Sequence, residues 1–246
     1  MRFPLILMTA LLVAGCMRTA KDTASEQAQQ TPEVQKPPTV TREQWKSEPQ
    51  PLPEETKHTP QYITIHHGGV DWKPGRDPVE FVRAVQKWGQ KERNWPDLPY
   101  HFMIAPDGRI FECRPLEYAP QSNTKYDLPG HVGIELMGNF QTQRPSEAQL
   151  KSLVALTAWV SQEYKIDPDQ HIAGHRDVAQ GQTSCPGKDL DRYLKDGQLV
   201  GWVKKTLAGK DPQVKPGEPL PDGPTVVVDT PVPGPAVSEA EKSAPK

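Results

Sequence analysis

Three residues in the middle of the chain are of types that often serve as metal ligands. His66 ends an alternating run just before two glycines, His175 lies between a glycine and Arg-Asp, and Cys185 follows ten positions later, just before Pro-Gly. Two histidines and one cysteine leave one corner of a tetrahedral zinc site open, which is typical of catalytic rather than structural zinc. A lone histidine is more often a surface or core residue, and a buried cysteine more often a packing residue. The spacing alone leaves both interpretations open.

The residues that lead up to His66 predict a β-strand. Apolar and polar residues alternate over 62–67, with Ile63, Ile65 and His67 on one face and His66 on the other. We therefore expect His66 to point out of the sheet into a cleft. We expect His67 to be a packing neighbour and not a ligand.

The rest of the central region alternates helical and strand patterns. Valines at three-residue steps follow a capping aspartate and Pro78, and Ser146 with Gln149 can form a capping box at the start of a second amphipathic helix. The elements predicted in this way are a helix over 77–95, a hairpin around Pro-Asp-Gly over 98–115, a strand over 130–140, a helix over 145–166 and a short helix over 189–207. Interleaved strands, hairpins and helices predict an α/β fold with a single mixed central β-sheet flanked by α-helices.

The two ends of the chain have compositions unlike the middle. Residues 1–15 have the layout of a secretory signal peptide, and the sequence LVAGC resembles a bacterial lipobox, which implies cleavage before Cys16 and lipidation of that cysteine. A soluble secreted protein with a stray cysteine is the alternative. We expect a disordered tether over 16–57, one globular domain over 58–209 and a proline-rich disordered tail over 210–246.

Charge and cysteine content limit the function classes. The net charge of -2 gives no basic field, so we expect no nucleic-acid partner. Exported proteins usually pair their cysteines, and Cys113 and Cys185 could form a disulfide. The competing explanation is that Cys113 is a small hydrophobic residue within a strand and Cys185 is a metal ligand.

Four motifs carry a family resemblance. The segments IHHGG, WPDLPYHFMIAPDGRIFE, VGIELMGNF and GHRDVAQGQTSCPG resemble, in that order, the motifs of zinc N-acetylmuramoyl-L-alanine amidases related to peptidoglycan-recognition proteins. The resemblance implies that family's fold, one zinc ion held by His66, His175 and Cys185, and hydrolysis by a zinc-activated water. The bond implied is the amide between the lactyl group of N-acetylmuramic acid and the L-alanine of the stem peptide.

The same resemblance implies the catalytic residues. Glu135 matches a functional glutamate of one branch, and Tyr100 matches a tyrosine that other branches use near the metal. Thr183 stands where some relatives carry a lysine, and we include it in the catalytic set. The alternatives to these catalytic roles are that Glu135 is an ordinary exposed glutamate of its strand and that Tyr100 only packs in the core. We expect Arg176 and Asp177 to fix the loop around His175, where an aspartate that accepts the spare N–H of the imidazole would be usual.

Two other functions fit the motifs less well. The first is a non-catalytic peptidoglycan-binding module, but such relatives typically lose the cysteine that this chain keeps as Cys185. The second is a zinc peptidase that cuts within the stem peptide. We expect peptidoglycan or muropeptide fragments as partners, a membrane contact through the lipid alone, and an outer-membrane location facing the periplasm.

Overall fold

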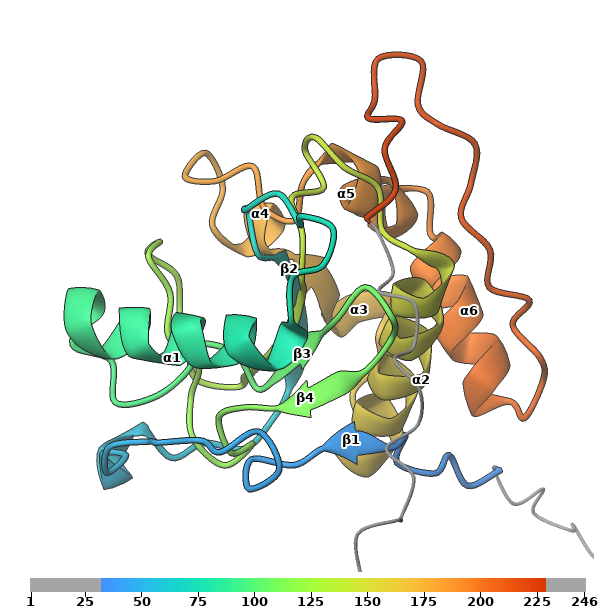
Figure 1. The fold of residues 1–246 in the computed structure, drawn as a ribbon. Coiled ribbons are helices and arrows are strands. Elements are labelled where there is room, and N and C mark those ends of the chain that lie inside the picture. Colours follow the sequence, from blue (N-terminus) through green and yellow to red (C-terminus); the bar gives the residue numbers. More distant parts are fainter. Residues whose placement is uncertain (1–31, 229–246) are drawn as a thin grey trace, which may run out of the picture. The chain divides into compact units, whose positions relative to one another are not determined.

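The computed structural model describes residues 32–228, and a six-stranded sheet forms its centre (Figure 1). The strands lie in the order β1-β4-β3-β5-β2-β6, with β3 and β4 antiparallel and all other neighbours parallel. Their bounds are β1 Thr39–Val40, β2 Tyr62–His67, β3 Phe102–Ile104, β4 Ile110–Glu112, β5 His131–Leu136 and β6 Ile172–Gly174. The prediction of a single mixed sheet is confirmed.

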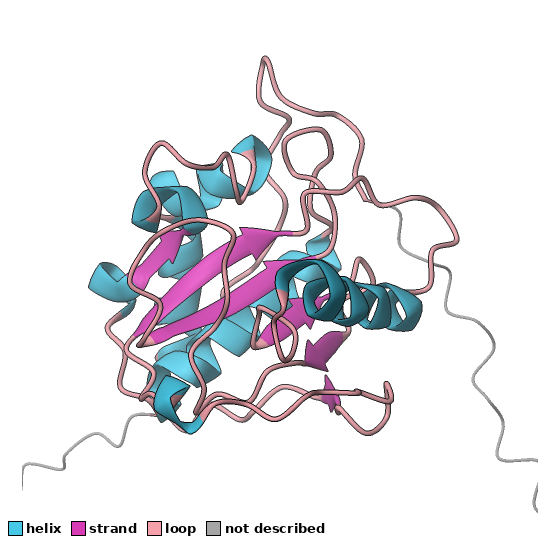
Figure 2. Ribbon diagram, turned by 90° about the vertical axis from the view of Figure 1, so that its left-hand side faces the viewer, coloured by secondary structure: helices cyan, strands magenta, loops and turns pink. Residues whose placement is uncertain are grey.

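Helices cover both faces of the sheet. Helix α1 lies on one side, and α2 with α6 lies on the other (Figures 1 and 2). The helices are η1 Glu54–Thr56, α1 Pro78–Arg93, α2 Glu147–Glu163, α3 Pro168–His171, α4 His175–Val178, α5 Lys188–Lys195 and α6 Gln198–Leu207. Because both faces are covered, every residue of β5 is buried.

The predicted helix starts are confirmed in detail. The Asp77 side chain accepts the amide of Val79 at 2.8 Å, and Pro78 occupies the first turn of α1. At α2, Ser146 and Gln149 form the reciprocal capping box. The single helix expected over 189–207 is wrong, because Gly197, with φ of 76°, separates α5 from α6.

The expected tether over 16–57 is wrong for residues 32–57. Strand β1 pairs with β4 at the edge of the sheet, and the Trp45 side chain is fully buried, donating its indole N–H to the Glu112 carbonyl at 2.7 Å. One aromatic residue in a polar segment gives no periodic signal, although it is large enough to anchor the segment in the core. Residues 16–31, with Cys16, lie outside the described residues.

The expected disordered tail is also wrong for its first part. Val214 and Val228 are buried, and residues 226–228 exchange backbone hydrogen bonds with Arg144 at 2.7 and 2.9 Å. Prolines favour an extended chain, but they do not prevent isolated valines from packing into the core. Residues 229–246 lie outside the described range.

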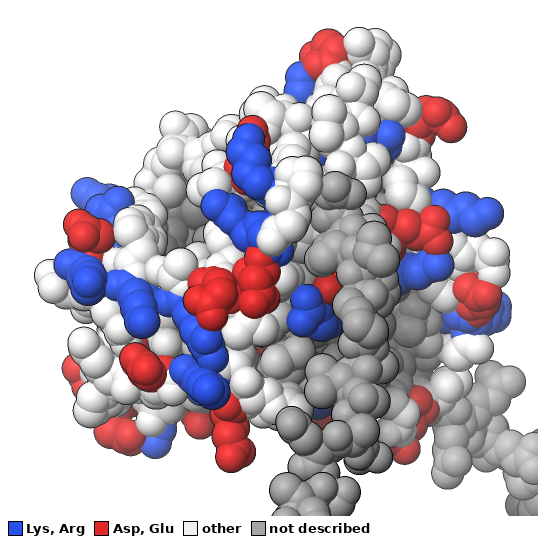
Figure 3. All heavy atoms as spheres, in the orientation of Figure 1, with Lys and Arg blue, Asp and Glu red and all other residues white. Residues whose placement is uncertain are grey.

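The surface of the described domain carries both signs of charge. On the face shown in Figure 3, basic and acidic side chains lie close to one another. No helix within 32–228 is long and apolar enough to cross a bilayer.

Candidate metal centre

The carboxyl ends of three parallel strands meet at one edge of the sheet. In β2, His66 lies opposite Glu135 of β5, and β6 ends at Gly174, directly before His175. Side chains at the carboxyl ends of parallel strands converge on the crevice outside the sheet, where ligands bind in α/β proteins. The order of the strands therefore brings together residues that are more than 100 positions apart in the sequence.

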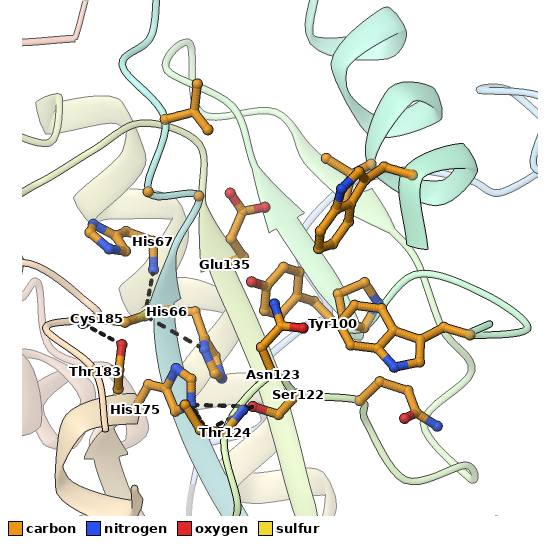
Figure 4. Close-up of a pocket in the computed structure, with 18 of the residues that line it drawn as sticks. His66, His67, Tyr100, Ser122, Asn123, Thr124, Glu135, His175, Thr183 and Cys185 are labelled. Atoms are coloured by element: carbon orange, nitrogen blue, oxygen red, sulfur yellow. Dashed lines mark hydrogen bonds between the residues drawn. The ribbon is translucent and has the colours of Figure 1, made fainter. Parts of the chain in front are cut away.

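The predicted ligands form one compact group (Figure 4). One ligand atom from each of His66, His175 and Cys185 lies within 4.8 Å of the other two, and all three residues are buried. The Cys185 Sγ lies 3.7 Å from His66 Nδ1, and the centres of the two imidazole rings are 4.5 Å apart. Cys113 and Cys185 are both free, so the disulfide alternative is wrong.

The protonation of these side chains fits a metal site. Burial lowers the pKa of His66 well below its ordinary value and lowers that of His175 to about 4, so both rings are neutral at pH 7. Neutral imidazoles offer the lone pairs that a metal needs. Burial also raises the pKa of the Cys185 thiol to about 12, and a coordinated cation would stabilise the thiolate at that position. Two neutral imidazoles and one thiol that ionises on binding suit Zn²⁺.

A threonine orients the second histidine. The Thr124 hydroxyl lies 2.6 Å from His175 Nε2, which leaves Nδ1 as the ring nitrogen free for a metal. Asp177 does not accept this N–H, but it fixes the loop around His175 as expected, because its carboxylate accepts the Gly174 amide at 3.0 Å and pairs with Lys195. Asp177 thus fixes the backbone before the ligand instead of its ring.

Backbone and hydroxyl groups hold Cys185 in place. Its sulfur accepts the backbone N–H of His67 at 3.4 Å, and its own amide donates to the Thr183 hydroxyl at 3.0 Å. The His67 imidazole accepts the Phe140 amide through Nδ1 at 3.1 Å and is not part of the His66, His175 and Cys185 cluster. Its role as a packing neighbour agrees with the expectation.

Glu135 is buried beside this candidate metal cluster. Its side chain is fully inaccessible, and neither carboxylate oxygen has a hydrogen-bond partner among residues 32–228. Burial raises the pKa of this carboxyl to about 8. The alternative of an exposed strand glutamate is wrong. A buried carboxyl with a shifted pKa and no partner is typical of a functional group.

Tyr100 also lies beside the candidate metal cluster. Its ring centre is 5.0 Å from that of His66, and burial raises the pKa of its phenol well above the ordinary value. The phenol therefore keeps its proton and can donate it in a hydrogen bond. Glu135 and Tyr100 both line the cavity above the cluster (Figure 4).

The cavity above the cluster has a volume of about 700 Å³. Helix α1 supplies an apolar wall with Phe81, Val85 and Trp88, and the loop of residues 121–124 supplies a polar wall. This size and mixture are typical of sites that bind small organic ligands. The polar wall could not be predicted, because residues 121–124 have no periodicity that would indicate an element.

A mixed sheet with a buried His₂Cys cluster, a carboxyl group and an open cavity defines an α/β protein with a candidate catalytic metal site. A family model described as N-acetylmuramoyl-L-alanine amidase matches residues 56–188, more than half of the chain. The chain belongs to this family.

Known relatives agree with this placement. Mouse peptidoglycan recognition protein 1 is 29% identical over 158 residues, which cover 63% of this chain and 85% of the relative. The pig N-acetylmuramoyl-L-alanine amidase is 28% identical over 138 residues, which cover 54% of this chain but 23% of that protein.

Solved structures show the same fold. Drosophila PGRP-LB is 27% identical with a TM-score of 0.56, and the match covers 64% of this chain and 92% of that one. The amidase LysC from Clostridium intestinale is 26% identical with a TM-score of 0.53, and the match covers 66% of this chain and 97% of that one. A variant of Drosophila PGRP-LB, 28% identical with a TM-score of 0.55 over 64% and 92% of the two chains, was solved in complex with tracheal cytotoxin.

Proposed function

We propose that this protein is a zinc-dependent N-acetylmuramoyl-L-alanine amidase, which hydrolyses the amide between the lactyl group of N-acetylmuramic acid and the L-alanine of the peptidoglycan stem peptide. The observation that carries the proposal is the placement of Glu135 directly across the β2–β5 pair from His66, in a cavity whose other side chains include His175 and Cys185. Family membership and the relatives named as amidases support the reaction class.

The three ligands would hold the zinc ion. When bound there, zinc supplies Lewis-acid polarisation of the scissile carbonyl and makes water more acidic. Thr124 fixes the ring of His175, and the His67 amide donates to the Cys185 sulfur, so the donor atoms are oriented before the metal binds.

Glu135 is the general acid–base group in this proposal. Its carboxylate accepts a proton from the attacking water and then donates it to the leaving nitrogen of L-alanine. A pKa of about 8 suits both tasks near neutral pH, because a general acid–base works best when its pKa lies close to the working pH. A cation at the ligand cluster would favour the ionised form with which the cycle starts.

Tyr100 and Thr183 have different roles in the proposed reaction. The protonated Tyr100 phenol donates a hydrogen bond to the oxyanion that develops on the scissile carbonyl. The Thr183 hydroxyl accepts the Cys185 amide, so we assign it a role in positioning the ligand loop. Thr183 lacks the charge of a lysine, and oxyanion stabilisation therefore depends more on Tyr100 and the metal.

A peptidoglycan-binding module without catalysis is the second candidate, because recognition proteins are among the relatives. The two functions separate in one experiment. Purified full-length protein is incubated with muropeptides, with and without a chelator, and the products are identified by mass spectrometry. We expect free stem peptide and intact saccharide, loss of both on chelation, and recovery with added zinc. Binding without any cleavage would favour the module, and cleavage within the peptide would indicate a peptidase.

We also propose that the protein is an outer-membrane lipoprotein that acts on peptidoglycan or its fragments from the periplasmic side. The support is the lipobox-like sequence that ends at Cys16, which lies outside the described residues. The Cys16→Ser variant should move from the membrane fraction to the soluble fraction. Retention of that variant in the membrane fraction would contradict lipid anchoring.

A further inference from the structure

Arg76 lines the same cavity but has no part in the chemistry described above. It follows the loop after β2, directly before the capping residue of α1, and it is one of the residues that line the cavity. Its guanidinium carbon lies 5.6 Å from the ring centre of Trp72 and 5.2 Å from that of Phe81. Two aromatic rings thus hold the cation in place without neutralising it.

The guanidinium is left with unused hydrogen-bonding capacity. Its Nη1 is buried and has no hydrogen-bond partner among residues 32–228. The Nη1 of the buried Arg114 also lacks a partner, but Arg114 does not line the cavity, and its Nε donates to the Leu98 carbonyl at 2.8 Å. A buried donor without an acceptor is costly, so such a group in a cavity indicates a ligand that supplies the acceptor.

The chemistry of that ligand follows from the residue type. A guanidinium presents a planar fork of N–H donors that matches a carboxylate, and such charge-assisted hydrogen bonds are about twice as strong as neutral ones. Among the described residues that line the cavity, Arg76 is the one lysine or arginine. An anionic group on a bound molecule would therefore be directed to this part of the cavity.

We propose that Arg76 determines substrate specificity by binding a carboxylate of the stem peptide. The inference rests on the proposed amidase function, because a stem peptide is the part of that substrate that carries carboxylates. The amidase would then cleave stems with the free carboxylate faster than stems in which the same group is a carboxamide, which has nearly the same shape but no charge.

The test compares matched muropeptides, each with one stem carboxylate either free or converted to the carboxamide. For the full-length wild type we expect kcat/KM to be roughly 10- to 100-fold higher for one of the free acids than for its amide. In Arg76→Gln the rate on that acid should fall to the level of the amide, while the rate on the amide stays unchanged. Arg76→Lys should recover part of the preference.

Arg93→Gln is the matched control. Arg93 lies at the other end of α1, 5.2 Å from the ring centre of Trp88, but does not line the cavity. This variant should keep the full preference for the acid. The proposal is overturned if the wild type treats every acid and amide alike, or if Arg76→Gln slows both substrates equally while its thermal unfolding is unchanged.

Binding of the same muropeptides, measured by calorimetry, separates this proposal from the amidase proposal. If the wild type cleaves nothing but binds the acid more tightly than the amide in a manner that depends on Arg76, the amidase proposal fails and the role of Arg76 stands. If the wild type cleaves both substrates and neither the rate nor the affinity depends on Arg76, the amidase proposal stands and the role of Arg76 fails.

Discussion

The Glu135 carboxylate lies against Gly68, where any other residue would place a side-chain atom too close to it. A Cβ added to Gly68 would lie 2.6 Å from Glu135 Oε1, which is closer than two such atoms can approach. The second of the two glycines that follow β2, Gly69, has a φ of 68° and makes the turn. The two glycines therefore have different roles: Gly69 makes the turn, and Gly68 leaves room for the Glu135 carboxylate. The turn could be predicted from the sequence, whereas the contact with Glu135 could not.

Gly68→Ala should displace the Glu135 carboxylate without disturbing the metal ligands. We expect kcat to fall roughly 100-fold, since a misplacement of about 1 Å can have this effect, with zinc content unchanged. Gly201→Ala is the control, because an added Cβ there meets nothing within 4 Å. Steady-state kinetics and metal analysis provide the measurements. Wild-type kcat in Gly68→Ala would contradict the proposed position of the base.

Glu135→Gln removes the proton-transferring group and keeps the side-chain volume. We expect kcat to fall by about 10²- to 10⁴-fold, with one zinc ion still bound per chain. Tight binding of muropeptide should remain, and calorimetry can measure it. A variant that hydrolyses the amide at the wild-type rate would rule out Glu135 as the acid–base group.

At the scale of the elements, the strand patterns were the most informative part of the sequence. The alternation before His66 placed that residue at the end of β2, and the parallel pairing with β5 then put Glu135 opposite it. Thr124 escaped prediction because it lies 51 positions from His175 in a loop whose conformation depends on the folded surface around it. Local periodicity cannot report such a contact.

Trp45 anchors the segment that leads into the domain. Besides its bond to the Glu112 carbonyl, its own carbonyl accepts the Arg83 guanidinium Nε–H at 2.8 Å. Trp45→Ala should lower the free energy of unfolding by about 3–5 kcal/mol, because it leaves a large cavity and an unpaired carbonyl at Glu112. Urea unfolding measures the change. A loss below about 1 kcal/mol would show that the segment does not stabilise the domain.

His101 connects two loops to the sheet and makes stability depend on pH. Its Nδ1 accepts the Gly133 amide, its Nε2 faces the Tyr118 carbonyl, and burial lowers its pKa to about 3. The unfolded chain binds a proton near pH 6.5, so this histidine contributes stability above that pH. The contribution is lost as the pH falls from 6.5 toward 3, at up to about 1.4 kcal/mol per pH unit.

The slope of stability against pH tests this role of His101. In His101→Gln, whose amide can make both hydrogen bonds, the free energy of unfolding should fall less steeply between pH 6 and pH 4 than in the wild type. Urea unfolding at each pH supplies the values, and comparing slopes removes the fixed effect of the substitution. Equal slopes would contradict the low pKa of His101.

At the scale of the whole molecule, both flanking segments belong to the described domain. The domain expected over 58–209 extends over all the described residues 32–228, since β1 covers the outer edge of β4 and residues 226–228 pair with the backbone of Arg144. Covering a sheet edge protects it from pairing with other chains. The composition of both segments indicated disorder, because the few apolar side chains that become buried hardly change the average polarity of a segment.

The central claim is that His66, His175 and Cys185 hold the zinc ion on which amide cleavage depends. The two described cysteines allow a direct test, because both are buried and free but only Cys185 belongs to the cluster. The measurement is zinc per chain, by metal analysis of the purified full-length protein, together with the rate of muropeptide cleavage. The wild type and Cys113→Ala should contain one zinc ion and be active, and Cys185→Ala should lose most of its zinc and at least about 100-fold in rate. Full zinc content and full activity in Cys185→Ala would contradict the account.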